Sequence, residues 1–357
     1  MSLLHEYVPQ IDVGGTKVGE WFPMRSCQVS SFGLDSLEFA ERPTPAPGPG
    51  EVLVGVRAVS LNYRDLMVVK GQYNPKMKLP RIPCSDGAGE VVAAGAGVTR
   101  WKPGDRVVAI FMQNWLDGPL TAAKGRGALG GDIDGMLSDY VILKQDGLVA
   151  IPDHLSFQEA ATLPCAAVTA WNALAACDVK PGSTVLIQGT GGVSIFALQF
   201  ARLKGARVLG ISSSYEKLER AGSMGLDSGL NYRDNPEWDR WVMDQTGGEG
   251  VDLVVEVGGQ GTLARSLRSI RHGGTIAQVG VLTGNAEPVP ISSILHKVAR
   301  VQGIYVGSRA DFLEMNRAIA LSELRPVGEE FHWTQARQVM ERMSEGLHFG
   351  KMVLTIN

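Results

Sequence analysis

The sequence predicts an α/β protein in which a doubly wound parallel sheet is joined to a second, mostly β domain. Its 357 residues are more than one small core needs and fit two domains. After about residue 155, apolar strands alternate with helices, an order typical of parallel sheets with right-handed crossovers. A glycine-rich turn joins the first of these strands to its helix, as in sheets that bind dinucleotides.

The composition is that of an ordinary globular protein with an excess of glycine. Apolar residues make up 44% and charged residues 20%, whereas the 44 glycines exceed the usual share. Such an excess suits tight turns and main chain that approaches a ligand closely. The net charge of −3, with both signs interspersed, argues against a nucleic-acid or anionic-membrane partner. No apolar run reaches the length of a membrane helix, and the four cysteines show no paired spacing, so we expect a reducing, cytoplasmic location.

A mostly β domain is predicted over residues 24–155, after an N-terminal extension at residues 1–23. The extension carries several charges and no long apolar stretch, unlike a signal peptide. Apolar residues alternate with others over 51–58, as in a half-buried strand, and further β-type segments follow at 89–94 and 106–111. Residues 112–135 contain six glycines and few aliphatic side chains, so we expect a long loop there.

The second domain is predicted over residues 156–295, beginning with a helix at 157–177. Its strands are expected at 183–188, 207–211, 251–255 and 275–279. The intervening helices are expected at 193–204, 215–224, 236–245 and 261–270. From residue 296 the regularity fades, and the chain ends in a segment typical of an edge strand, residues 351–356.

The run Gly189-Thr190-Gly191-Gly192-Val193-Ser194 predicts a dinucleotide site, because it lies directly between a strand and an amphipathic helix. Glycine allows the sharp turn and lets main chain approach a pyrophosphate, and the helix N-terminus offers free N–H groups. Ser194 replaces the third glycine and is small enough for the helix to pack closely on the strand. The alternative is an ordinary βα turn that holds no phosphate.

NADP is favoured over NAD by the end of the strand at 207–211. An NAD enzyme of this kind places Asp or Glu there to hold the ribose 2′-hydroxyl. This strand ends instead in Ser212, Ser213 and Ser214, with Lys217 following, and hydroxyls with a positive charge suit a 2′-phosphate. The alternative is that the serines only cap the next helix.

Four further stretches extend the pattern from residue 24 to the C-terminus. They are residues 62–66 (Asn-Tyr-Arg-Asp-Leu), 84–91, 102–107 and 167–171. With the glycine loop they make the chain resemble the medium-chain dehydrogenase/reductase superfamily, and most closely its zinc-free branches such as the quinone oxidoreductases. The resemblance implies a GroES-like substrate domain at 24–155 and 296–357, a Rossmann NADP-binding domain at 156–295, and a homodimer that pairs through residues near 301–306.

The resemblance also implies that no catalytic zinc is held. The zinc branch has Cys, His and Cys where this chain has Asn62, Ser85 and Cys165. Amide and hydroxyl side chains are poor zinc ligands, and one thiolate does not hold the metal alone. The four closely spaced cysteines of that branch's structural zinc lobe are also missing from residues 112–135. We therefore expect no metal site.

Three candidate catalytic residues follow from the resemblance: Asn62, Tyr63 and Tyr73. A hydride donor must be held close to an electrophilic carbon, and hydrogen-bond donors must stabilise the oxygen on which charge develops. Asn62 and Tyr63 take the place of the metal pocket, beside nicotinamide and substrate. Tyr73 matches a Gly-x-Tyr position that enoyl reductases of the superfamily use near the substrate. The alternative for both tyrosines is a buried ring with a satisfied hydroxyl.

Further cofactor contacts are implied in the same way. Thr169 would reach the nicotinamide end, and Tyr232 would meet the 2′-phosphate. The remaining positions follow later strands or close the cleft: Val257, Gly258, Gly280, Val281, Leu282, Phe349 and Lys351. For Lys351, a solvated surface lysine is an equally good interpretation.

The sequence thus predicts a zinc-independent, NADPH-dependent oxidoreductase that transfers hydride to a quinone, enone or aldehyde. Two alternatives stay open: a zinc-free alcohol dehydrogenase that runs toward oxidation, and a catalytically idle NADP-binding protein. The six histidines are widely separated, so neither a histidine metal cluster nor a Ser-His-Asp hydrolase is predicted.

Overall fold

The structure is a computed structural model that describes residues 12–13, 16–17, 23–286, 288–289 and 291–356. The chain divides into two compact units. Unit 1 comprises residues 1–164, 330–345 and 352–357, and unit 2 comprises residues 165–329 and 346–351. Most of the predicted extension at 1–23 lies outside the described residues. The described part of it includes two paired strands of two residues each, β1 (Asp12–Val13) and β2 (Thr16–Lys17).

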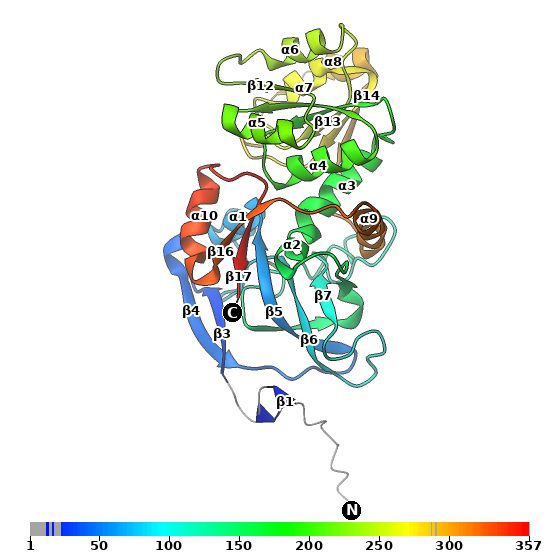
Figure 1. The fold of residues 1–357 in the computed structure, drawn as a ribbon. Helices are drawn as coiled ribbons and strands as arrows, with labels where there is room; N and C mark the ends of the chain where they lie inside the picture. Colours follow the sequence, from blue (N-terminus) through cyan, green and yellow to red (C-terminus); the bar gives the residue numbers. More distant parts are fainter. Residues whose placement is uncertain (1–11, 14–15, 18–22, 287, 290, 357) are drawn as a thin grey trace, which may run out of the picture. The chain divides into compact units, whose positions relative to one another are not determined.

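Unit 1 is built on antiparallel strands (Figure 1). Strands β3 (Pro23–Val29) and β4 (Leu37–Pro43) form an antiparallel two-stranded sheet of their own, beside a sheet of seven strands. The sheet runs in the order β16-β17-β5-β6-β7-β9, and β8 also pairs with β5. Its strands are β5 (Glu51–Leu61), β6 (Asp86–Ala94), β7 (Arg106–Ala109), β8 (Tyr140–Lys144), β9 (Leu148–Ala150), β16 (Gly328–His332) and β17 (Lys351–Thr355).

Three helices accompany this sheet: α1 (Tyr63–Val69), α2 (Phe157–Ala161) and α10 (Ala336–Ser344). Buried side chains from the sheet and from α10, among them Val54, Leu148 and Met340, form one apolar cluster, which also includes Leu137 from the segment before β8. The alternation predicted for 51–58 is seen at every position except Leu53, which is buried although it was expected on the other face. Helix α2 packs against β5 and β6. Residues 112–135 contain no helix or strand, as predicted for a long loop.

Unit 2 holds a six-stranded sheet in the order β12-β11-β10-β13-β14-β15, and all neighbouring strands are parallel. The strands are β10 (Thr184–Gln188), β11 (Arg207–Ser212), β12 (Ser228–Asn231), β13 (Val251–Glu256), β14 (Ile270–Gln278) and β15 (Arg300–Gly303). The helices are α3 (Val168–Ala175), α4 (Gly192–Leu203), α5 (Tyr215–Ser223), α6 (Trp238–Gln245), α7 (Leu263–Ser269), α8 (Ile291–Lys297) and α9 (Arg309–Ser322). The predicted doubly wound parallel sheet is confirmed, with the strand order reversing at β10 and β13.

Three predictions about segment placement are wrong. Residues 296–329 belong to unit 2, because β15 adds to β14 as a sixth parallel strand. The terminal strand β17 lies between β16 and β5 rather than at the sheet edge. The expected helix at 157–177 is α2, a π-helical turn (Leu163–Ala167) and α3, with the unit boundary at Cys165. The short strand β12 was not predicted.

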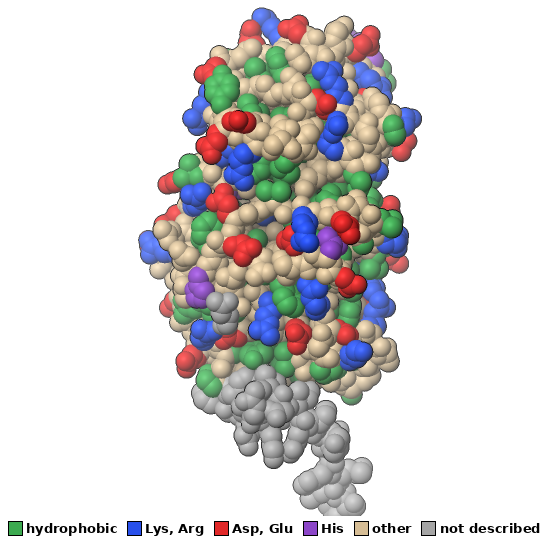
Figure 2. Space-filling model, in the orientation of Figure 1, with side chains coloured by type: hydrophobic (Ala, Val, Ile, Leu, Met, Phe, Trp, Pro, Cys, Tyr) green, Lys and Arg blue, Asp and Glu red, His purple; other side chains and the backbone are tan. Residues whose placement is uncertain are grey.

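Charge is distributed as the composition suggests. On the face shown in Figure 2, basic and acidic side chains are interspersed and do not form a large patch of one sign. In the part of the chain that is described, no helix has the length and hydropathy required to cross a membrane.

Candidate functional site

The glycine loop of unit 2 has the geometry of a dinucleotide-binding turn. Gly189, with φ +70°, donates its N–H to the Ile211 carbonyl at 2.7 Å. Gly191 is the N-cap of α4, so the free N–H groups of this twelve-residue helix begin at the loop. Ser194 donates its hydroxyl to the Gln188 carbonyl at 2.6 Å. The residue that replaces the third glycine thus ties the helix directly to β10.

Residues 346–351 form a short segment, here called the C-terminal strap, that runs along this loop. The Gly350 N–H donates to the Thr190 carbonyl at 2.9 Å, and Gly350 forms a β-bridge with Gly191. The Lys351 side chain is 3% exposed, and its Cδ would lie 2.5 Å from a Cβ on Gly192. Only glycine at 192 leaves room for this lysine, which is buried rather than solvated.

The strap is also held by helix α5. Lys217 Nζ donates to the Gly346 carbonyl at 2.6 Å. The Arg220 guanidinium lies 4.1 Å from the centre of the Phe349 ring, which is almost fully buried. Phe349 therefore packs inside unit 2, and the cation predicted for the 2′-phosphate has a main-chain partner in the strap.

The end of β11 presents the three predicted serines. Ser214 is the N-cap of α5 and accepts the Lys217 N–H at 3.3 Å, so the capping interpretation holds for this serine. Ser212 is buried and accepts the Ser214 N–H at 3.4 Å, while Ser213 is half-buried. Tyr232, 39% exposed, donates its N–H to the Ser212 carbonyl at 3.0 Å. These residues therefore gather at the carboxyl ends of β11 and β12.

A buried carboxylate organises the ends of β13 and β14. Glu256 is fully buried and accepts five hydrogen bonds. The donors are Gln188 Nε2 at 2.8 Å, Gly258 N at 2.8 Å, Gly259 N at 3.0 Å, Thr262 Oγ1 at 2.7 Å and the Ser266 hydroxyl. It thus fixes the turn after β13 that carries the predicted cofactor residues.

The loop after β14 lies beside this turn. Leu282 N–H donates to the Val257 carbonyl at 3.1 Å, and Thr283 N–H donates to the Gly258 carbonyl at 2.9 Å. A Cβ on Gly280 would lie 2.8 Å from the Val257 oxygen, so glycine is needed for this approach. Val281 and Leu282 are about half exposed, and Thr169 is buried in α3. Most of the predicted cofactor residues therefore lie at the carboxyl edge of one parallel sheet, where such sheets bind ligands.

In unit 1, Asn62 stands at the junction of β5 and α1. Its N–H donates to Asp65 Oδ2 at 2.8 Å, and the Asp65 N–H donates to the Asn62 carbonyl at 2.9 Å, which begins the helix. Its side-chain Nδ2 donates to Ser85 Oγ at 3.4 Å, and Ser85 in turn donates to Asp86 Oδ1 at 2.7 Å. All four side chains are buried. Asn62 and Ser85 are therefore neighbours, joined by a long hydrogen bond.

Cys84 precedes Ser85 in the same core. Burial, reinforced by the charge of Asp65, raises the pKa of the Cys84 thiol well above its ordinary value. The thiol is therefore protonated at neutral pH and does not act as a nucleophile.

The predicted tyrosines are both accessible. Tyr63, the first residue of α1, is 39% exposed, and Tyr73, in the turn-rich segment after α1, is 38% exposed. Neither is the fully buried ring of the alternative interpretation. Between them in sequence, Arg64 stacks its guanidinium on Tyr73 at 5.0 Å and on Phe111 at 4.8 Å, measured to the ring centres.

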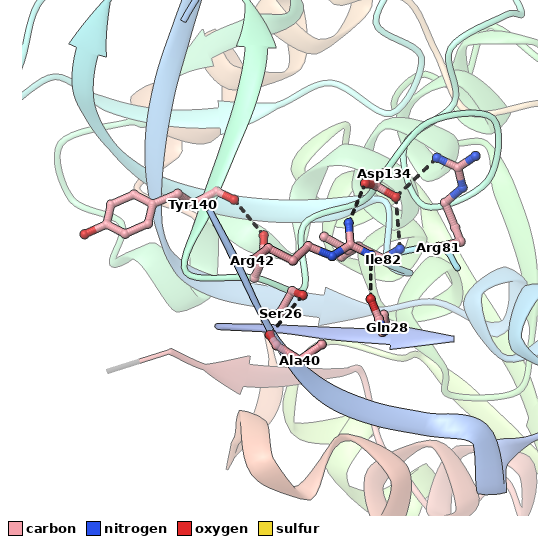
Figure 3. A network of polar contacts seen from close by, with 9 residues as sticks. Ser26, Gln28, Ala40, Arg42, Arg81, Ile82, Asp134 and Tyr140 are labelled. Carbon is pink, nitrogen blue, oxygen red and sulfur yellow. Dashed lines mark hydrogen bonds and ion pairs between the residues drawn. The ribbon is translucent and has the colours of Figure 1, made fainter. Parts of the chain in front are cut away.

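The end of the 112–135 loop is fastened by Asp134 (Figure 3). Its carboxylate accepts from Arg42 Nη1 at 3.1 Å, from Arg81 Nη1 at 3.2 Å and from the Ile82 N–H at 3.1 Å. Arg42 in turn donates to Gln28 Oε1 at 2.5 Å. The loop is thus attached to β3, β4 and the segment before β6.

Comparisons with known proteins agree with this architecture. Residues 48–153 match the alcohol dehydrogenase GroES-like domain, and residues 192–321 match the zinc-binding dehydrogenase family. A zinc-type alcohol dehydrogenase-like protein of Schizosaccharomyces pombe is 42% identical over 334 residues, which are 91% of this chain and 96% of that protein. The chain belongs to the medium-chain, zinc-type alcohol dehydrogenase family.

Two other relatives lie in the same family. An alcohol dehydrogenase of Geobacillus stearothermophilus is 32% identical over 94% of this chain and its own full length. The crystal structure of an NAD-dependent alcohol dehydrogenase superposes with a TM-score of 0.86 at 33% identity, covering 94% of this chain and all of the other. This family member is an alcohol dehydrogenase-like, NAD(P)-dependent oxidoreductase, with the predicted GroES-like and Rossmann-like parts. The narrower assignment to a quinone oxidoreductase branch stays a prediction.

The residues at the family's zinc position do not fit the metal. The resemblance places two of its ligands at Asn62 and Ser85, and these side chains bond to each other. Neither offers the thiolate or imidazole that zinc prefers. Among the residues that the structure describes, no three His, Cys, Asp or Glu side chains form a group that would hold a metal ion.

Sequence reasoning missed several residues that shape the site. Glu256 and Asp134 were not among the predicted site residues, and neither was Gly346, which accepts the hydrogen bond from Lys217. A glutamate that directly follows the apolar residues Leu253–Val255 and precedes Val257 and two glycines was a usable signal for Glu256. No local signal marks the partners of Arg64 or Asp134, because these lie far along the chain.

We predict that Glu256→Gln weakens both folding and cofactor binding. All five groups that face the carboxylate are donors, and an amide would turn its own N–H₂ toward at least two of them. Buried donors left without acceptors cost about 1–3 kcal/mol of unfolding free energy. Chemical denaturation and a nucleotide titration would measure the two effects. Glu249→Gln, at an exposed position of the same unit, is the control. Equal stability of the two variants would contradict the prediction.

Proposed function

We propose that this protein is a zinc-independent, NADPH-dependent reductase of small carbonyl, enone or quinone substrates, acting in the cytoplasm. The observation that carries the proposal is the buried Asn62–Ser85 pair at the family's metal position. An amide and a hydroxyl there supply hydrogen-bond donors in place of a Lewis acid. The interspersed surface charge in Figure 2 suits a small-molecule substrate better than a nucleic acid.

In this proposal, hydrogen bonds from the protein stabilise the substrate oxygen. The bound nicotinamide supplies the hydride. The 3.4 Å bond from Asn62 to Ser85 is at the long limit for an N–H donor, so little is lost when Asn62 turns this N–H to a substrate oxygen. The side chains of Tyr63 and Tyr73 are partly exposed. The hydroxyl of either would donate the proton that completes the reduction after hydride transfer.

The cofactor would be held at the carboxyl edge of the unit 2 sheet. The free N–H groups of α4 and the glycine loop would face the pyrophosphate, with the buried Lys351 beside them. Ser212–Ser214, Lys217 and Tyr232 would meet the 2′-phosphate, where an Asp or Glu would repel it. Thr169, Val257 and the Gly280–Leu282 loop would lie along the remainder of the nucleotide.

A zinc-free alcohol dehydrogenase is the second candidate. The names of the relatives favour alcohol as the substrate class: one is a zinc-type alcohol dehydrogenase-like protein, one an alcohol dehydrogenase and one an NAD-dependent alcohol dehydrogenase. An alcohol or aldehyde substrate would then replace the enone, and the same donors would hold its oxygen.

We predict that protein stripped of metal by 1,10-phenanthroline still reduces an enone with NADPH. The expected rate equals that of untreated protein, because no step uses zinc, and elemental analysis should find well below one zinc per chain. Loss of activity on chelation, with recovery on adding zinc, would contradict zinc-independence. If the protein oxidises alcohols but reduces no enone, quinone or aldehyde, the second candidate is the function.

We predict that NADPH binds more tightly than NADH and that Lys217→Ala removes this preference. Losing one charge-assisted contact to a phosphate should lower NADPH affinity about 10-fold or more. Lys217 also holds the strap through Gly346, which would affect both nucleotides alike, so the NADPH/NADH ratio separates the two roles. Fluorescence titration measures it. Lys204→Ala, at the far end of α4, is the control. An unchanged ratio would leave Lys217 as a strap contact only.

We also propose a homodimer that forms through β15 and α8. β15 is the outer strand of the unit 2 sheet and all four of its residues are exposed. Next to it along the chain, Ile291, Leu295 and Val298 are 77%, 73% and 69% exposed. An open strand edge with apolar neighbours invites isologous pairing with a second copy.

The dimer is expected to dissociate when charge is placed on this surface. Light scattering should give twice the chain mass for the wild type and a monomer for Leu295→Lys. Leu321→Lys, an equally apolar and exposed position on α9, should leave the dimer intact. A monomeric wild type at micromolar concentration would refute the proposal.

A further inference from the structure

Arg64 is a charged residue of unit 1 that contacts several segments and that the proposed reaction does not use. It follows Asn62 and Tyr63 at the start of α1, and its side chain is only 11% exposed. Its guanidinium lies between the Tyr73 ring, 5.0 Å away, and the Phe111 ring, 4.8 Å away. Stacking on aromatic faces is a property of the planar guanidinium that lysine does not share.

The edge of the same guanidinium reaches the long loop. Arg64 Nη1 donates to the Leu129 carbonyl at 2.6 Å, and Asp65 Oδ1 lies 3.8 Å from the same nitrogen. A side chain on Gly131 would collide with Arg64 Nη2, so the loop passes directly over the arginine. Arg64 on α1 therefore contacts three other segments: the turn that contains Tyr73, Phe111 just after β7, and residues 129–131 of the loop.

Tyr73 depends on such a contact for its orientation. It lies in residues 70–78, which form turns without a helix or strand, and its N–H donates to the Met67 carbonyl at 3.2 Å. More than a third of the side chain is exposed, and the Arg64 guanidinium is one of the groups that orient the ring. The stacked guanidinium lies over the ring, and the Tyr73 side chain is 38% exposed.

We propose that Arg64 is a positioning residue of this enzyme, which holds Tyr73 and residues 129–131 in place for the substrate. This inference rests on the proposed function, since it takes Tyr73 to be the group that meets the substrate. Arg64 acts through Tyr73 and the loop and does not touch the reacting atoms. A small displacement of such a group costs up to about 100-fold in rate.

The kinetic test is a double-mutant cycle of Arg64→Gln and Tyr73→Phe, with NADPH and an enone. Arg64→Gln alone should lower kcat about 10- to 100-fold with unchanged NADPH affinity. In the Tyr73→Phe background the same change should have a clearly smaller effect, because the Tyr73 hydroxyl is already lost and only the hold on residues 129–131 is left to lose. Arg64→Lys should not restore the rate, since lysine keeps the charge and loses the two-sided stack. Additive losses, or rescue by lysine, would overturn the positioning role.

Arg106 offers a matched control in the same unit. Its guanidinium stacks on Phe157 at 4.9 Å and donates to the Leu155 carbonyl at 2.5 Å, and none of these partners is a predicted site residue. Arg106→Gln should cost stability without the kinetic signature. If Arg106→Gln and Arg64→Gln lower kcat equally, Arg64 is only a structural residue and the inference is wrong.

A measurement without turnover separates this inference from the proposed function. Trypsin cuts after Lys124 and Arg126, both in the 112–135 loop. Release of residues 129–131 should speed this cleavage about 10-fold in Arg64→Gln, and not in Arg106→Gln. Unchanged cleavage would refute the hold on the loop, whatever the activity. A wild type that reduces no enone, quinone or aldehyde would instead refute the proposed function, while the cleavage result still tests Arg64.

Discussion

The carboxylate of Glu256 holds together the part of the unit 2 sheet where the strand order reverses. It receives Gln188 from β10, two main-chain N–H groups from the turn after β13, and two hydroxyls from the start of α7. A fully buried carboxylate is tolerated only when its oxygens are satisfied, and here five donors do so. The rest of the cofactor edge depends on this arrangement, because the turn it fixes carries the main-chain carbonyls that bind the loop after β14.

The glycine loop is supported from a different direction. The C-terminal strap pairs with it through Gly350, and α5 holds the strap through Lys217 and Arg220. One residue beyond the strap, Met352 pairs with Leu61 at the end of β5, directly before Asn62.

The proposed replacement of the metal by hydrogen-bond donors changes what the protein must supply. A single zinc ion polarises a substrate carbonyl strongly. Hydrogen-bond donors achieve the same effect only when several of them are already oriented toward the substrate oxygen. Unit 1 shows that kind of support: Asn62 is fixed by Asp65, Tyr73 is stacked on Arg64, and the long loop is anchored by Asp134. In each contact a charged group binds a residue that lies outside regular secondary structure.

The sequence by itself determined the features that depend on short stretches of chain. The alternation of strands and helices, the turn at Gly189–Ser194, the serines after β11 and the lack of cysteine at position 62 all follow from local spacing and residue type. The tertiary structure alone decided that β15 joins the parallel sheet, that β17 lies inside the other sheet, and that Arg64 meets Tyr73, Phe111 and Leu129. Strand pairing and stacking join residues far apart along the chain, and a local pattern of polarity contains no information about such partners.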